Sequence, residues 1–289
     1  MSRKHPVVAV TGSSGSGTST VKRALESIFL REDVNPVYVE GDAFHRYTRA
    51  EMPAQLAAAE AEGRVLSHFG PGGNCFDKLQ ALFADYGRDG SGYLRRYIHA
   101  DDALTPEEAA RVGEFTQWEP IPKNTDLMFY EGLHGLYVDD DHDIAKHVDL
   151  GLGVVPIVNI EWIQKIHRDN TERGYTREET IETILRRMPD YINHIVPQFS
   201  RTDINFQRVS TVDTSNPFIA RDIPTLNESF VVIRFSDPAK FRIDFPYLLS
   251  MLKDSFMSRR NTIVVPGGIM GLAMEVILMP IIHNLMLNR

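Results

Sequence analysis

The sequence has only one cysteine, Cys75, and little positive charge: its formal net charge is −8 at pH 7 over 289 residues. One cysteine cannot form a disulfide within the chain, which suits a reducing compartment. Nucleic-acid-binding proteins normally carry a basic stripe, so the acidic balance argues against that class. The balance does not exclude a phosphate-bearing ligand, because a local group of arginines and lysines can override the field of the whole chain.

Long apolar runs are also missing. The most apolar late segment, 269–287, has a longest uninterrupted run at 276–282, about a third of the roughly 20 residues that a membrane span needs. We expect a buried or interface helix there, and a soluble protein with no membrane partner. A strand-like run begins near Pro6, which leaves no room for a signal peptide and favours a cytoplasmic location. The ten histidines show no spacing typical of a zinc site.

Strand-like apolar runs alternate with helical periodicity along the chain, which predicts an α/β fold. No linker or repeat is visible, so we expect a single domain over 1–289, with a possible flap or hairpin insertion at about 85–117. Two continuous apolar runs, 127–130 and 150–158, are typical of central strands in a parallel sheet. Further strands are expected at 7–10, 37–39, 209–212, 230–235 and 262–265, and helices at 19–29, 53–62, 76–86, 161–173, 177–192, 247–256 and 269–287.

A turn rich in glycine and serine follows the first predicted strand and opens the first predicted helix. It matches G-x-x-x-x-G-K-[ST] except that Thr18 replaces the lysine. Glycines let backbone N–H groups converge on phosphate oxygens, and Ser19 would offer its hydroxyl to Mg²⁺. The alternative is an N-cap turn without a ligand, and the missing lysine requires a cation from elsewhere. The turn consists of Gly12, Ser13, Ser14, Gly15, Ser16, Gly17, Thr18, Ser19 and Thr20.

Two acidic residues follow predicted strands. Glu131 ends an apolar run, as does the Walker-B acid that serves Mg²⁺. Asp42 lies in the polar loop after the second strand, where ligands of open α/β sheets collect. It could accept the proton of a substrate hydroxyl while His45 and Arg49 hold an anionic acceptor. Taken singly, a strand-end acid is more often solvated, and Asp42 after Gly41 is ordinary turn chemistry.

Three charged residues share one face of a predicted helix. Lys165, Arg168 and Asp169 have i, i+3 and i+4 spacing, which a surface ion-pair ladder would also explain. The missing lysine favours a site, because this face is the best local source of replacement charge, and Arg173 extends it. A base, a metal carboxylate and a Lys/Arg pair are sufficient for phosphoryl transfer, which needs positioning and cations.

These motifs together resemble bacterial phosphoribulokinases, within the P-loop uridine kinase-like superfamily. The resemblance covers essentially the whole chain, and Thr18 in place of lysine is itself typical of the bacterial class. It implies a P-loop-type mixed, mainly parallel sheet flanked by helices. It also implies transfer of the ATP γ-phosphate, with Mg²⁺, to the 1-hydroxyl of D-ribulose 5-phosphate, giving ribulose 1,5-bisphosphate in Calvin cycle carbon fixation. The segments that carry the resemblance are 12–20, 40–49, 129–135, 164–169, 197–205, 213–221 and 244–247.

The resemblance implies a role for each site residue. Asp42 looks like the general base, and Glu131 and Asp169 look like acids that serve metal and catalysis. Lys165 and Arg168 look like the phosphate clamp. The residues similar to the family's sugar-phosphate contacts are His45, Arg49, Tyr97, His99 and Arg173.

The resemblance implies further properties. It predicts a cytoplasmic bacterial protein that forms a homo-oligomer, often an octamer in this family, and that is activated by NADH and inhibited by AMP. No dinucleotide fingerprint is present, so an effector site would be built from basic residues, with Arg31, Arg234 and Arg259 as candidates. The disulfide switch of the plant enzymes is chemically impossible within this chain, because Ser16 stands in the turn and Cys75 is alone.

Two other functions compete with this interpretation. Another superfamily kinase, acting on a nucleoside or pantothenate, would not need the basic loop 45–49 for a substrate phosphate. A catalytically inactive nucleotide-binding regulator would explain the lost lysine. It would not explain why these four residues are all present: Asp42, Glu131, Lys165 and Asp169.

Overall fold

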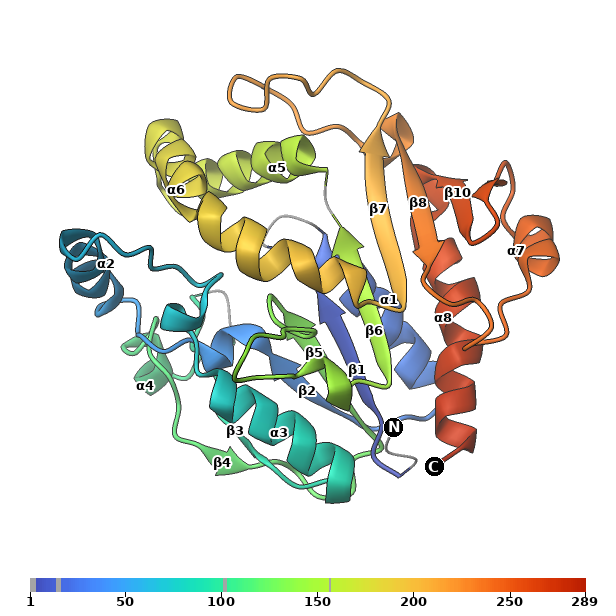
Figure 1. The fold of residues 1–289 in the computed structure, drawn as a ribbon, viewed down its shortest axis with the longest axis horizontal. Helices are drawn as coiled ribbons and strands as arrows, with labels where there is room; N and C mark the ends of the chain where they lie inside the picture. Colours follow the sequence, from blue (N-terminus) through green and yellow to red (C-terminus); the bar gives the residue numbers. More distant parts are fainter. Residues whose placement is uncertain (1–3, 14–16, 101–102, 156) are drawn as a thin grey trace.

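An eight-stranded sheet forms the centre of the molecule (Figure 1). The structure is a computed structural model that describes residues 4–13, 17–100, 103–155 and 157–289, without the side chain of Ser19. The strand order is β2 (Pro36–Glu40), β5 (Leu127–Gly132), β1 (Val7–Thr11), β6 (Leu150–Val155), β7 (Ile204–Ser210), β8 (Ser229–Phe235), β10 (Thr262–Pro266) and β9 (Phe256–Arg259). The first five strands in this order are parallel, and the last three are antiparallel to their neighbours. The predicted α/β fold with a mainly parallel sheet is confirmed.

Helices cover both faces of the sheet, because its central strands are apolar on both sides. Val8 and Val10 of β1 pack in one cluster with α1 (Thr18–Arg31) and α8 (Met270–Leu287). Val7 and Ala9, which alternate with them, pack in a second cluster with α3 (Phe76–Asp89). The paired helices α5 (Val158–Thr171) and α6 (Arg177–Asp190) lie beyond the arrowheads of β1 and β6, and α2 (Met52–Ala61) projects outward beside them (Figure 1).

Helix α8 agrees with the expectation of a buried helix. By length and composition, Gly267–Leu287 is also apolar enough to cross a membrane. Seven of its side chains are buried in the core, and the helix packs against α1. Core helices of soluble proteins meet the same length and composition test.

Several predicted boundaries differ from the structure. β7 begins at Ile204, five residues before the expected 209: buried Ile204 and Phe206 alternate with partly exposed Asn205 and Gln207, a period-2 pattern that the sequence analysis overlooked. The helix expected at 247–256 is the shorter α7 (Phe245–Met251), after which the chain forms edge strand β9. Helix α3 continues to Asp89, so residue 85 does not start an insertion; the excursion that follows holds β3 (Tyr93–Leu94), paired with β4 (Glu119–Pro120), and α4 (Pro106–Ala109).

Candidate active site

The carboxyl ends of β1, β2 and β5 lie side by side and hold the first half of the site. The register pairs Glu131 with Val10 of β1 and with Glu40 of β2. The backbone N–H of Gly12 donates to the carbonyl of Gly132 at 3.1 Å, which fixes the start of the turn against β5. A Cβ on Gly132 would lie 2.7 Å from the Cα of Gly41, so only glycine allows β5 and the loop after β2 to approach this closely.

The glycine- and serine-rich turn of residues 12–20, called the phosphate turn below, leads directly into α1. Gly17 has φ 101°, a left-handed conformation that favours glycine, and α1 begins at Thr18. Thr18, at the position of the missing lysine, hydrogen-bonds to Glu131. Burial raises the pKa of Glu131, and the Thr18 hydroxyl and the charge of Lys22 oppose the rise. Ser14, Gly15 and Ser16 lie outside the described residues.

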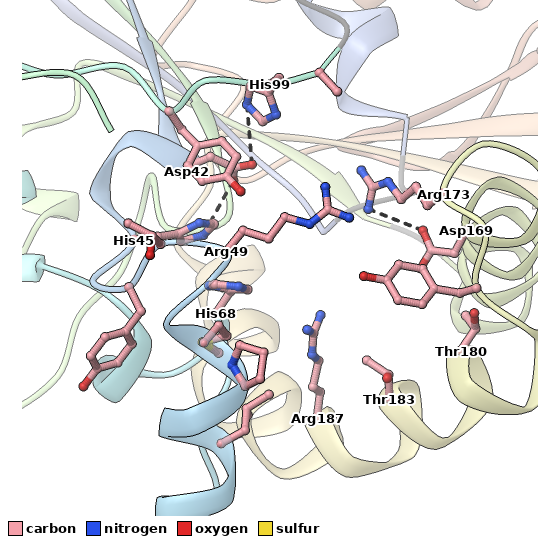
Figure 2. A pocket seen from close by; sticks show the side chains of 18 of the residues that line it. Asp42, His45, Arg49, His68, His99, Asp169, Arg173, Thr180, Thr183 and Arg187 are labelled. Atoms are coloured by element: carbon pink, nitrogen blue, oxygen red, sulfur yellow. Dashed lines mark hydrogen bonds and ion pairs between the residues drawn. The ribbon is translucent and has the colours of Figure 1, made fainter. Parts of the chain in front are cut away.

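The loop after β2 carries Asp42 in a short 3-10 turn (Gly41–Phe44). Its carboxylate oxygens lie 3.6 Å from Nε2 of His45 and 3.9 Å from Nε2 of His99 (Figure 2). Burial, reinforced by neighbouring positive groups, lowers the pKa of His45 to about 3, so this imidazole is neutral at pH 7. Asp42 keeps 44% of its side chain exposed, so a substrate hydroxyl could reach it.

Three cations surround Asp169 on α5. Lys165 donates to one carboxylate oxygen, and Arg168 and Arg173 reach the other at 3.1 and 3.4 Å. Burial alone would raise the pKa of Asp169, but the hydrogen bonds and charges of Lys165 and Arg168 lower it below its ordinary value. The predicted shared face of the helix is therefore confirmed, and it is a buried charge cluster rather than a solvated ladder, since Asp169 is only 4% exposed.

A cavity of ≈ 750 Å³ joins the loop after β2 to α5 and α6. Its volume is in the range of small-molecule sites. Although the chain is acidic overall, the lining residues that the structure describes include five Lys or Arg and four Asp or Glu. Figure 2 shows Asp42 and Asp169 on opposite sides of the cavity with the Arg49 guanidinium between them. The predicted residues that line it are Asp42, His45, Arg49, Tyr97, His99, Lys165, Asp169 and Arg173.

Not every predicted residue lines this cavity. Arg168 contacts the lining residue Asp169 from outside the lining, and Glu131 is hydrogen-bonded to Thr18 of the phosphate turn. Among the effector candidates, Arg31 pairs with Glu275 on α8 at 2.9 Å. Arg234 and Arg259 flank Thr262 in one row across β8, β10 and β9, so they share one face of the sheet.

Among the lining residues to which the sequence analysis gave no role are Arg187 and His68. Arg187 projects from α6 into the cavity (Figure 2), although the sequence fits a solvated helix face equally well. The ring of His68 lies 3.9 Å from that of His45, centroid to centroid, and its buried Nδ1 has no hydrogen-bond partner among the described residues. Helical spacing could have drawn attention to Arg187, because it lies four residues after Thr183, which also lines the cavity from α6. Nothing in the local sequence singles out His68.

The comparisons with known proteins agree with this geometry. The model of the "Phosphoribulokinase / Uridine kinase family" matches residues 7–215. The chain belongs to this family. It is 55% identical to "Phosphoribulokinase, plasmid" of Cupriavidus necator over 100% of this chain and 98% of that protein, and 56% identical to "Phosphoribulokinase" of Nitrobacter vulgaris over 99% and 98%. The solved structure "Phosphoribulokinase from Rhodobacter spheroides" superposes with a TM-score of 0.89 at 51% identity, covering 99% of each chain.

The donor set fits the Mg²⁺ that a kinase family implies. Mg²⁺ prefers carboxylate and hydroxyl oxygens and usually binds one or two carboxylates plus substrate phosphates. Glu131 offers a partly buried carboxylate at the end of β5, and a divalent cation bound there would oppose the rise in its pKa that burial causes. The charge of Asp169 is already balanced by three cations. Its position suits a role in orienting Lys165 and Arg168 at least as well as a role as a metal ligand.

Proposed function

We propose that this chain is a phosphoribulokinase: an ATP- and Mg²⁺-dependent kinase that phosphorylates the 1-hydroxyl of D-ribulose 5-phosphate, giving ribulose 1,5-bisphosphate. The observation that carries the proposal is the cavity that Asp42 and a Lys/Arg cluster line together, with Asp42 on one side and Asp169 with Arg173 on the other. Full-length identity above 50% to proteins named phosphoribulokinase supports the same acceptor.

The transfer needs one bond formed, one broken and one proton moved. The O1 oxygen of the sugar attacks the γ-phosphorus, the bond from that phosphorus to the β–γ bridging oxygen breaks, and ADP leaves. Asp42 takes the hydroxyl proton, since it is the half-exposed carboxylate on the acceptor side of the cavity. Lys165 and Arg168, held by Asp169, balance the charge of the transferring phosphoryl group and replace the missing lysine of the turn.

The remaining basic wall of the cavity is suited to the 5-phosphate of the acceptor. Arg49 and Arg173 extend guanidinium groups toward one another from the two sides (Figure 2), which matches a bidentate phosphate site. His45, Tyr97 and His99 would contact the sugar. The turn formed by residues 12–20 would hold the ATP phosphates, with Ser19, Glu131 and Asp169 as ligands of Mg²⁺, which would neutralise phosphate charge when bound.

The finer properties that the resemblance implies belong to the same proposal. They include a cytoplasmic location and the absence of nucleic-acid or membrane partners. A homo-oligomer, with an octamer as the expected size, and activation by NADH complete it. The row of Arg234 and Arg259 supports an effector site on the β8–β10–β9 end of the sheet, far along the strand order from β1.

The decisive test is ADP release with MgATP and ribulose 5-phosphate, with uridine and pantothenate in parallel, each with and without NADH. Turnover with ribulose 5-phosphate alone is expected.

For Asp42→Asn we expect kcat to fall about 10³-fold with ATP affinity unchanged. A fall of this size is typical of a lost general base. Near-normal turnover of this variant would remove Asp42 from that role, and ATP binding without turnover on any acceptor would favour an inactive regulator.

A further inference from the structure

Glu161 is a buried carboxylate that the reaction described above does not use. It lies in the first turn of α5 and is 4% exposed. The hydroxyl of Ser13 donates to one of its oxygens, and the hydroxyl of Tyr191 donates to the other at 3.0 Å. Ser13 is 148 residues away in sequence and belongs to the phosphate turn. Glu161 therefore links the turn, α5 and the π-helical segment Tyr191–Ile195 that follows α6.

The placement of Glu161 couples the turn to the phosphate clamp. Glu161, Lys165 and Asp169 have i, i+4 and i+8 spacing, so they occupy one face of α5. Ser13, which is 1% exposed, directly follows the glycine that is bonded to β5. A contact between Glu161 and Ser13 thus sets the distance between the turn and the helix that carries Lys165.

The environment of Glu161 provides hydroxyl donors instead of a cation. The titratable or charged groups that act on it among the described residues are Tyr191, from the segment after α6, and Lys165, whose ammonium group is bonded to Asp169. Burial raises the pKa of Glu161 to about 7, and the bonds from Ser13 and Tyr191 limit the rise. This carboxyl group therefore changes charge in the range where a cytoplasmic kinase works, and it does so beside a turn that receives several negative charges.

We propose that Glu161 is a positioning residue for the nucleotide: it holds the start of the phosphate turn against α5, and it takes up a proton from solvent when the ATP phosphates bind. The inference rests on the proposed role of residues 12–20 in ATP binding. Because like charges repel across a buried site, the neutral carboxyl group is the form compatible with bound nucleotide. Nucleotide binding and proton uptake are then reciprocal, so ATP affinity falls as pH rises through the range where Glu161 ionises.

The test is calorimetric titration of the protein with MgATP in the absence of any acceptor, in two buffers of different ionisation enthalpy. For the wild type at pH 8 we expect a net uptake approaching one proton, and about 20- to 30-fold weaker binding at pH 8.5 than at pH 6. For Glu161→Gln, which keeps the size and hydrogen-bonding capacity of the side chain, we expect no such uptake and an affinity independent of pH. At pH 6, where wild-type Glu161 is neutral, both proteins should bind MgATP equally, which checks the fold of the variant.

Tyr191→Phe is the matched control, because it removes one hydroxyl donor and leaves the carboxylate and its contact with Ser13. It should keep the proton uptake but shift it to higher pH, because the Tyr191 hydroxyl limits the rise in the pKa of Glu161. Wild-type binding at pH 8 without proton uptake would overturn the inference even if the glutamine variant did not fold, and so would identical pH profiles for wild type and Glu161→Gln. Absence of MgATP binding at every pH would instead overturn the proposed nucleotide site, and this inference with it.

Discussion

Glu161 and Asp169 lie on one face of α5, two turns apart, and each is 4% exposed. Their pKa values nevertheless shift in opposite directions: that of Glu161 rises to about 7, and that of Asp169 falls below its ordinary value. Burial favours the neutral form of both groups, so the difference comes from their partners. Asp169 has Lys165, Arg168 and Arg173 around it, whereas Glu161 has two hydroxyl groups.

The comparison separates two uses of a buried carboxylate. At the Asp169 end of α5 a fixed negative charge holds three cations, which in the proposed function would receive a phosphate group. At the Glu161 end the same type of group, without a cation, can gain or lose a proton near neutral pH. Under the proposed function, one helix would hold the phosphate clamp with a permanent negative charge and would place a titratable carboxyl group beside the nucleotide turn.

Asp169→Asn should have the largest effect. It removes the charge that orients Lys165 and Arg168 and leaves these two partly buried cations without their shared partner, so we expect kcat to fall about 10³-fold. Glu161→Gln should stay within about tenfold of the wild-type kcat at pH 7, because the residue positions the turn and does not touch the transferring group. Steady-state kinetics with both substrates measures the pair. Equal losses in kcat for the two variants would remove the functional distinction between the two ends of the helix.

How far the sequence could predict this site follows from the range of each contact. The spacing of Lys165, Arg168 and Asp169 is local, so helical periodicity was enough to place them together, and a strand–turn–helix pattern was enough to locate the phosphate turn. Glu161 lies at the same helical spacing, but its hydrogen-bond partners, Ser13 and Tyr191, are 148 and 30 residues away in the sequence. Only the tertiary fold brings these groups together.

The same limit explains the other omissions. Arg187 is one of several charged residues on α6, and the packing of that helix over the cavity decides that it points inward. β7 is a different case: its start was misplaced although Ile204 and Phe206 alternate with Asn205 and Gln207, and its pairing with β6 and β8 on its two sides fixes where the strand begins.

Glu161→Gln should also change the free energy of unfolding in a pH-dependent way. Among the predicted effects, we expect this one to be the second largest, after that of Asp169→Asn on kcat. An acid whose pKa is about 7 when folded and 4.5 in its model state holds more protons in the folded state between these values. Wild-type stability therefore falls as pH rises from about 4.5 to 7, by about 3 kcal/mol for this group, and the cost stays constant above pH 7. The variant lacks this cost.

Urea unfolding at pH 5 and pH 8 measures the difference. Glu161→Gln should be more stable than the wild type at pH 8 by up to about 3 kcal/mol, and the difference should shrink toward zero at pH 5. Glu182→Gln, a change of the same chemistry on the exposed face of α6, is the control and should leave both values unchanged. A glutamine variant that is equally stable or less stable at pH 8 would show that the Ser13 and Tyr191 hydroxyls fully compensate the buried charge.

Arg173→Ala should have the smallest effect, since Arg173 is the most weakly held of the three cations around Asp169. It is half exposed and 3.4 Å from the carboxylate, so its loss leaves Lys165 and Arg168 in place and kcat within about threefold of the wild type. The KM for ribulose 5-phosphate should rise about tenfold, as expected for a residue that supplies mainly ground-state binding. Arg88→Ala, on α3 away from the cavity, is the matched control and should change neither parameter, because its pairs with Asp85 and Asp89 are exposed. A fall in kcat comparable to that of Asp169→Asn would instead place Arg173 in the phosphate clamp, and all three cations around Asp169 would then act on the transferring group.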